Sequence, residues 1–482
     1  MDTVWIKLIV KVGLVLAGLA LCFLWYYIKF LLIGRRISGA IERNDVAGLR
    51  ILLQRYRKYL VEDDCDVLVS FLMVAAMNDS AACMKELLAL GDAAQMQKKA
   101  MEDEEAELLN LCVQHGSPEV LREMLAAGMK AEVETESPWL RCFVYGSVEK
   151  ARVLAEFGAD KVTEEQMEEE HGNTPLHAVV YGWFYDPKSS GVMLDYLLNE
   201  YGADVNACTP SGNTPLDLAC SETQVGYEGN DELRRKLTEA GAVRGRCLRV
   251  PEPEYCGRVF VQGELPELSA MAGALPQGVT MVGHDEPWDK EKLSALLEEG
   301  SIKSEVAERM LSHTHYVEVT ARGNKGEDPI SVAERALLVL RMLETMPDVV
   351  GVQLMYAVGG AFRSEDETLY PYDLVGVALG RTDEDAYLLA TRGMEVYGLP
   401  EVELEMPEEV FESGKLSPFA PLADVLLQLM RGTAAIEPGH TMTLCNLFSE
   451  VEWDRHLTTG NLGYRILMSD EATPEHLLQP AE

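Results

Sequence analysis

Positively charged residues are scarce in this sequence. The 482 residues include 42 Lys and Arg but 79 Asp and Glu, which gives a formal net charge of −37 at pH 7. Such an excess of negative charge repels nucleic-acid phosphates, so we expect no nucleic-acid partner. The acidity serves either solubility or the attraction of a basic partner, and composition leaves both interpretations open.

Disulfide and metal-ligand patterns are also lacking. The ten cysteines form no Cys-x-x-Cys pair and no Cys/His spacing typical of a zinc site. Unpaired thiols spread through a chain are typical of a reducing compartment. His313 and His315 would share one face of a strand, but the later histidines have no recognisable ligand spacing, so no metal is expected.

Catalytic motifs are absent as well. No Gly-x-Ser-x-Gly turn is present, and no cysteine stands in a nucleophile signature. The segment 323–326 is rich in glycine but lacks the Gly-Lys-Ser/Thr ending of a phosphate-binding loop, which indicates an ordinary turn. We therefore expect no catalytic residues and no cofactor, and an enzyme with an unrecognised C-terminal activity remains the alternative.

A long apolar run lies near the N-terminus. Residues 12–28 contain no charged side chain, and with their flanks they predict a transmembrane anchor over residues 4–33. No small-residue cleavage site follows the run, which argues against a removed signal peptide. Four basic residues follow the run and two precede it, which predicts a single-pass membrane protein with the bulk of the chain in the cytoplasm.

Two related segments, 172–178 and 212–219, share the letters Gly-Asn-Thr-Pro-Leu, and Gly-Ala-Asp-Val-Asn stands between them at 202–206. These motifs closely resemble the ankyrin repeat family. Similar helix endings recur upstream and downstream, at residues 90–92, 127–129, 157–160 and 240–242. The resemblance implies an all-α solenoid of about six units over residues 37–243, whose first unit serves as the N-terminal cap.

The repeat motif also predicts local roles for its residues. Thr174 and Thr214 are expected to cap the first helices, and Gly202 to end a second helix with a positive φ. The resemblance to ankyrin repeats implies that the His177 side chain forms local hydrogen bonds near the start of a helix. The 40-residue spacing from Gly172 to Gly212 exceeds the usual period of about 33, which predicts an inserted loop over residues 182–191.

Two groups of repeat residues are candidates for partner binding. The aromatic side chains of the predicted insertion are either a binding hot spot or packing that closes a gap in the array. Loop residues of the last clear repeat would face the concave surface. The candidates are Trp183, Phe184, Tyr185, Ala207, Thr209 and Ser211.

A different pattern follows a predicted linker over residues 244–255. Short apolar runs predict strands at 279–282, 316–320, 349–356, 374–379, 387–391 and 402–404, and helices at 290–298, 330–344 and 422–431. They indicate an α+β domain over residues 256–482. Segments 355–362 and 391–403 resemble a bacterial domain family of unassigned function, and Arg392, Glu401 and Glu403 are candidates to line a cleft in it.

The sequence therefore predicts a multidomain protein with a transmembrane helix, an ankyrin-type solenoid and a C-terminal α+β domain. Its expected function is that of a membrane-anchored interaction or scaffold protein. The expected partners are a protein, basic if the acidity serves attraction, and the membrane through the N-terminal helix. A bacterial immunity-type protein that neutralises a basic toxin remains a further alternative.

Overall fold

A computed structural model describes much of the chain. The described residues are 31–61, 66–92, 96–97, 108–131, 136–162, 172–221, 230–265, 267–299, 303–355, 357–359, 371, 374–382, 386–412, 419–436, 441–444, 447–455 and 462–472. The chain forms two compact units, one of residues 1–170 with 182–201 and one of residues 171–181 with 202–482. Most of the helical repeats belong to the first unit, and the last repeat belongs to the second with the sheets.

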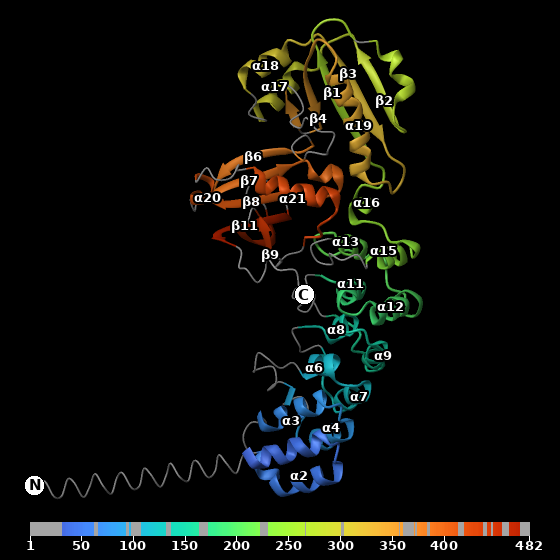
Figure 1. Ribbon diagram of the computed structural model, residues 1–482, viewed down its shortest axis with the longest axis vertical. Helices are drawn as coiled ribbons and strands as arrows, with labels where there is room; N and C mark the ends of the chain where they lie inside the picture. The colour runs from blue at the N-terminus through green and yellow to red at the C-terminus, as the bar shows by residue number, and fades with distance from the viewer. Residues whose placement is uncertain are drawn as a thin grey trace, which may run out of the picture. The chain divides into compact units, whose positions relative to one another are not determined.

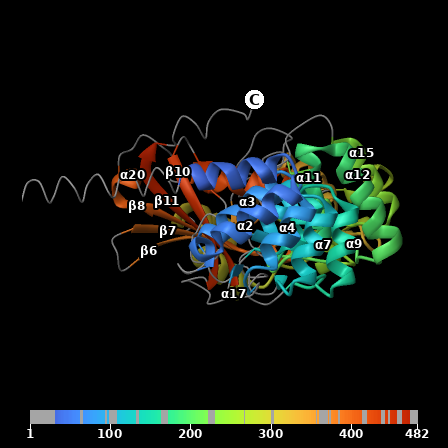
Figure 2. The ribbon, with the colours of Figure 1, turned by 90° about the horizontal axis from the view of Figure 1, so that it is seen from below.

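The repeats are successive helix pairs (Figure 1). A helix over residues 31–42 precedes the labelled elements. The pairs continue with α2 (Val46–Val61), α3 (Asp66–Met77), α4 (Ala81–Leu88), α6 (Leu108–His115), α7 (Pro118–Ala126), α8 (Pro138–Val144), α9 (Val148–Glu156), α11 (Pro175–Tyr185), α12 (Pro187–Tyr196), α13 (Pro215–Cys220) and α15 (Asn230–Glu239). Figure 2 shows the second helices α2, α4, α7 and α9 side by side, in agreement with their packing contacts.

A polar N-cap begins most second helices. Ser117 accepts a hydrogen bond from the Val120 amide, Ser147 from the Lys150 amide, and Asp186 from the amides of Lys188 and Ser189. Each cap satisfies an amide that would otherwise lack a partner at a helix start. The short turn between paired helices is therefore stabilised locally.

Helix ends and starts behave as the motif predicts at several positions. Gly202 has a φ of 76°, a conformation that glycine adopts without strain. Thr214 forms a capping box with Asp217. Gly91, which was predicted to end a helix in the same way as Gly202, does not have a positive φ.

The predicted insertion is not a loop, and this prediction was wrong. Residues 182–191 are helical except for Asp186, which is the N-cap of α12. The extra length instead extends α11 to Tyr185 and adds a π-helical turn, η2 (Leu197–Tyr201), after α12. A Pro after a capping Asp starts a new helix readily, since its missing amide needs no partner there.

The predicted linker over residues 244–255 is also structured. It contains the short helix α16 (Gly245–Arg249) and the first residues of strand β1 (Glu254–Val261). Pro251 and Pro253 interrupt helical periodicity as expected, but the arginines before them are bound to other parts of the second unit. The chain therefore passes from the last repeat to the first sheet without a free connection.

The first sheet has five strands in the order β2-β3-β1-β4-β5. Its strands are β1, β2 (Val279–His284), β3 (His315–Arg322), β4 (Val349–Leu354) and β5 (Ala357–Gly359), and its pairings are antiparallel. Helix α19 (Pro329–Glu344) packs on one face, where Gly257 leaves room for Leu340. Helices α17 (Lys290–Glu299) and α18 (Ser304–Leu311) bury Phe260 on the other face.

The second sheet has six strands in the order β6-β7-β8-β11-β10-β9. They are β6 (Gly376–Arg381), β7 (Ala386–Arg392), β8 (Val402–Pro407), β9 (Thr441–Leu444), β10 (Leu447–Arg455) and β11 (Leu462–Ala472). Strands β8 and β11 pair in parallel and the other neighbours antiparallel. Helices α20 (Glu408–Glu412) and α21 (Ala420–Arg431) follow β8 in the chain. The short 3-10 helices η3 (Leu268–Ala270) and η4 (Ala272–Ala274) lie between β1 and β2 in sequence, and η6 (Met394–Tyr397) lies between β7 and β8.

One hydrophobic core joins the two sheets. It combines Tyr255 and Leu340 from the first sheet and its helix with Leu404 and Leu426 from the second. The rings of Tyr255 and Tyr397 lie 6.3 Å apart at this boundary. The predicted α+β region thus contains two sheets over a shared core.

The predicted membrane span over residues 12–28 lies outside the described residues, and so does the predicted anchor 4–33 except for its last three positions. Those three positions belong to the helix over residues 31–42. Among the helices of the described segments, none combines the length and the apolar character needed to cross a membrane.

Candidate interaction surfaces

Ion pairs connect the second helices of successive repeats. Each pair joins a basic side chain on one helix to a glutamate on the next, at a similar position in each repeat. The pairs are Arg50 with Glu86 (2.6 Å), Lys85 with Glu123 (3.4 Å), Arg122 with Glu156 (3.0 Å) and Arg152 with Glu200 (2.8 Å). Exposed pairs add little stability. The ion pairs nevertheless cover the exposed face of the second helices with charges that already have partners.

A second row of side chains follows the turns between paired helices. In the second helices α2, α4, α7, α9 and α12, the residue two positions before the N-cap has an exposed side chain. These residues are Arg43, Asn78, His115, Tyr145 and Phe184. We call this row the turn edge. Its character changes along the chain from basic and polar to aromatic.

The aromatic end of the turn edge is built from two neighbouring turns. Tyr145, Phe184 and Tyr185 are 38%, 40% and 74% exposed, and the last two rings lie 5.4 Å apart in an edge-to-face arrangement. Gly182 brings α11 close to the end of α8, since an added Cβ would lie 2.6 Å from the Val144 carbonyl oxygen. Exposed aromatic rings of this kind are common anchors in protein interfaces.

Trp183 does not belong to this surface. Its side chain is 3% exposed, and the sequence-based proposal that it binds a partner directly is therefore corrected. In a helix the next residue points about 100° away, so Trp183 packs inward while Phe184 and Tyr185 point outward. For Trp183 the structure favours the second interpretation of the aromatic side chains, in which the indole packs inside the array and closes a gap.

The three loop candidates are largely covered. Thr209 and Ser211 are buried, and their hydroxyl oxygens are 2.9 Å apart. The Asn213 amide donates to the Thr209 hydroxyl at 3.2 Å, while Ala207 is half-buried. Thr209 and Ser211 therefore stabilise the loop internally and do not present side chains to a partner.

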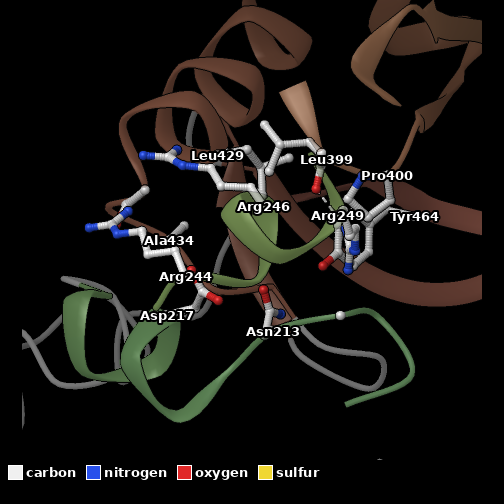
Figure 3. A pocket seen from close by; sticks show the side chains of 13 residues that line it. Asn213, Asp217, Arg244, Arg246, Arg249, Leu399, Pro400, Leu429, Ala434 and Tyr464 are labelled. Carbon is white, nitrogen blue, oxygen red and sulfur yellow. Dashed lines mark hydrogen bonds between the residues drawn. The ribbon is translucent and has the colours of Figure 1, made fainter. Parts of the chain in front are cut away.

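Three arginines after the last repeat bind carbonyl oxygens of the sheet region (Figure 3). Arg246 donates to Met430 O at 2.7 Å and Arg244 to Gly432 O at 3.3 Å, at the C-terminal end of α21. Arg249 donates to Gly398 O at 2.8 Å and also to Ser211 O. Cationic groups are favoured at a helix C-terminus, where backbone carbonyls lack partners.

The cavity between these arginines is small, about 20 Å³. That volume accommodates about one water molecule. Tyr464 and Pro400 help to close it, and Asn213 donates to Ile436 O at 2.9 Å across the same contact. The cluster is therefore a structural joint between the last repeat and the sheets.

The three C-terminal candidates do not converge on a cleft. Arg392 is exposed at the end of β7, whereas Glu403 is fully buried on β8. Glu401 accepts hydrogen bonds from Thr391 Oγ1 at 2.6 Å and from the amides of Gly393 and Met394 at 2.7 and 3.0 Å. These bonds hold the turn before η6.

Burial, with the Glu395 carboxyl beside it, raises the pKa of Glu401 above its usual range. Its bonds to a hydroxyl and two amides nevertheless assign it a role in shaping the turn. The segment 391–403 also contributes to the joint, through Gly398 and Pro400.

The histidine pair predicted to share a strand face is also structural. His313 precedes β3, where its Nε2 accepts from the Trp288 amide at 2.9 Å and its Nδ1 lies 2.7 Å from Met310 O. His315 begins β3 beside the Thr314 hydroxyl. Among the described residues, no group of three or more His, Cys, Asp or Glu side chains could hold a metal ion.

Burial also makes several thiols unreactive. It raises the pKa of Cys83, Cys247 and Cys256 above the usual value. A thiol with a raised pKa is a poor nucleophile at neutral pH, because the thiolate is the reactive form. These residues therefore lack the features of a covalent catalyst.

Sequence reasoning missed both the turn edge and the arginine joint. The turn edge had a signal, because small polar pairs recur at Asn44–Asp45, Asp79–Ser80, Gly116–Ser117 and Gly146–Ser147 before the second helices. The arginines of residues 244–249 were assigned to a linker. Their carbonyl partners in the sheet region lie 149 to 188 residues away, beyond any local pattern.

Comparison with known families gives one match. Residues 171–210 match the model of the ankyrin repeat family, and this stretch carries both the Thr174–Pro175–Leu176–His177 motif and the Gly202 loop. A search of curated proteins found no match. The chain therefore contains an ankyrin repeat, a module typical of protein–protein interaction.

Proposed function

We propose that this protein is a membrane-anchored scaffold that binds a protein partner along the turn edge of its repeats. The observation that carries the proposal is the exposed aromatic group Tyr145, Phe184 and Tyr185. The ankyrin match supports an interaction role, and fold alone names no ligand. The aromatic group supplies the anchor that such an interface needs.

The distribution of charge favours this edge over the second-helix face. Each basic side chain of the helix-to-helix ion pairs already has a glutamate, so a partner docking there would have to displace these pairs. The aromatic side chains of the turn edge expose apolar ring surface instead. Burying apolar surface is the main favourable contribution to association.

The partner that fits is a basic protein with an apolar patch. The chain has an acidic excess of 37 charges, which would accelerate the approach of a basic protein. The aromatic group would then slow dissociation by burying its rings. Charge and aromatic surface thus act on different steps of the same binding event.

Membrane attachment is assigned to residues 12–28, whose uncharged apolar run supports a spanning helix. The basic residues that follow the run support a cytoplasmic location for the repeats and sheets. The C-terminal domain, bound to the last repeat through Arg244, Arg246 and Arg249, is proposed to present a second binding surface in a fixed relation to that repeat.

The test is site-specific crosslinking in cells that produce the full chain. A photoreactive phenylalanine analogue replaces Tyr185 in one version and Val192 in another; Val192 is 58% exposed on the second helix of the same repeat. We expect a discrete crosslinked protein at position 185 and none at 192. The same product at both positions, or none at 185, would contradict the proposal.

A matched substitution gives the second readout. Phe184→Ala with Tyr185→Ala should weaken capture of the crosslinked partner, once identified, by at least tenfold through faster dissociation. Val192→Ala is the control and should leave dissociation unchanged. Equal effects of the two changes would show that the aromatic group is not the anchor.

A further inference from the structure

The first helix pair is basic in a protein that is otherwise strongly acidic. Residues 31–58 contain seven Lys and Arg but only two Asp and Glu, whereas the whole chain has a net charge of −37. The remainder of the chain therefore carries all of the acidic excess. A segregation of charge this strong points to a local partner of negative charge.

The basic residues surround a groove of about 550 Å³ between the helix over residues 31–42 and α2. Arg35, Arg36 and Arg43 line it, and all three are exposed. Among the described residues, none of the three has a carboxylate partner within ion-pair distance. Arg50, further along α2, is by contrast paired with Glu86.

Small residues open the groove where the two helices meet. Gly39 and Gly48 line it, and a Cβ at Gly39 would come within 3.2 Å of the Arg43 guanidinium. Among the described lining residues, Asp45 alone is acidic, and its Oδ1 accepts from the Gly48 amide at 2.9 Å at the start of α2. The charge of the groove itself is therefore positive.

Apolar side chains stand at the rim of the groove. Leu32 and Ile51 line it and are 54% and 66% exposed, so aliphatic surface lies beside the arginines. Positive walls with an apolar rim match a phospholipid, whose phosphate binds arginine and whose acyl chains contact aliphatic surface. An acidic peptide without apolar side chains would leave Leu32 and Ile51 uncovered.

We propose that this groove binds the headgroup of an anionic phospholipid and holds the first repeat against the membrane surface. The proposal rests on the proposed anchor, because residues 12–28 would leave the bilayer within a few residues of Arg35. Juxtamembrane clusters of Lys and Arg are attracted to anionic lipids, with about 1 kcal/mol for each residue near the surface. The acidic remainder of the chain is repelled by the same surface, which orients the first repeat toward the lipid.

The test is lipid titration of the full chain in detergent, followed by native mass spectrometry. Phosphatidylglycerol and phosphatidylcholine are added separately, and retained lipid is measured for each. We expect selective retention of phosphatidylglycerol. The triple substitution Arg35→Glu, Arg36→Glu and Arg43→Glu should weaken that retention by at least about 100-fold, since three attractions are lost and three repulsions are added.

Two further variants separate the groove from general charge. The control variant combines Arg122→Glu, Arg234→Glu and Arg235→Glu. It changes the net charge by the same amount as the groove variant, but at sites outside the groove, and it should retain phosphatidylglycerol like the unmodified chain. Ile51→Gln replaces one apolar side chain of the rim without changing the charge, and it should reduce retention. Because these side chains are exposed, helical circular dichroism should be unchanged.

Several outcomes would overturn the proposal. They are equal retention of the two lipids, loss of retention in the control triple variant, no loss in the groove triple variant, full competition by inorganic phosphate, and retention of RNA in place of lipid. Alkaline carbonate washing of membranes tests the anchor separately. If the unmodified chain leaves the pellet, the anchor fails, while lipid selectivity in detergent still decides whether the groove binds the headgroup.

Discussion

Arg246 and Asp328 form an ion pair that connects the last repeat to the sheet region. Arg246 lies on α16 and is 7% exposed, and its guanidinium also donates to Met430 O. Asp328 is the N-cap of α19 and accepts from the Ile330 amide at 3.1 Å. Two side chains therefore hold α16, α19 and the end of α21 together.

Replacing Arg246 should destabilise this second unit. Arg246→Ala leaves the Asp328 carboxylate without its cation and the Met430 carbonyl without this donor, so we expect a loss of about 3 kcal/mol in the free energy of unfolding. Urea denaturation of the full chain in detergent measures the change. Arg235→Ala, which breaks an exposed pair with Glu239, is the control and should cost less than about 1 kcal/mol. Equal losses of unfolding free energy in the two variants would show that the buried ion pair stabilises the protein no more than the exposed one.

Trp183 and Tyr185 should respond differently to truncation. Trp183→Ala leaves a cavity at a buried site and should cost about 3 to 5 kcal/mol of unfolding free energy. Tyr185→Ala removes a ring that is 74% exposed and should change the free energy by no more than about 0.5 kcal/mol. Chemical denaturation distinguishes them. A small effect of the tryptophan substitution would contradict the inward packing.

Gly202 should not tolerate a β-branched residue. Its φ is 76° and no atom lies within 4 Å of an added Cβ, so the cost of Gly202→Val arises from the backbone conformation alone. We expect a loss of about 1 to 2 kcal/mol. Gly380→Val on β6 is the matched control, because that site is equally open but lacks a positive φ. Thermal unfolding of both variants checks the contrast.

His177 should make stability depend on pH. Its Nδ1 accepts from the Thr174 amide at 3.2 Å, its Nε2 lies 3.1 Å from Asn213 O, and burial lowers its pKa to about 4. Between about pH 6.5 and 4 the unfolded chain binds a proton that the folded chain does not. The stabilisation that depends on neutral His177 is therefore fully present above about pH 6.5. As the pH falls toward 4, the free energy of unfolding decreases by up to about 3 kcal/mol.

The measurement is the free energy of unfolding at several pH values in this range. His177→Gln keeps a polar side chain but has no proton to bind, so its stability should fall less steeply than that of the unmodified protein. Parallel pH profiles for the two proteins would mean that other groups cause the dependence.

The sequence by itself determined the features that depend on neighbouring residues. Thr214 caps its helix because Asp217 follows three residues later, and Gly202 ends a helix because it alone lacks a Cβ there. Short apolar runs likewise located strands β2, β3 and β7, because strand formation there follows from neighbouring residues. In each case the interactions that decide the structure lie within about one turn or one strand.

Tertiary structure alone decided which of these residues are accessible. Phe184 and Tyr185 are exposed while Trp183 is buried, because the approach of α11 to α8 at Gly182 sets the direction of each side chain. Thr209 and Ser211 are buried where a concave surface was expected.

The same holds for long-range partners. Arg246 binds Met430, which lies 184 residues further along the chain, and β8 pairs in parallel with β11 although helices α20 and α21 and strands β9 and β10 lie between them in the sequence. Such contacts depend on how whole elements pack, since only the folded chain brings distant carbonyls and side chains together.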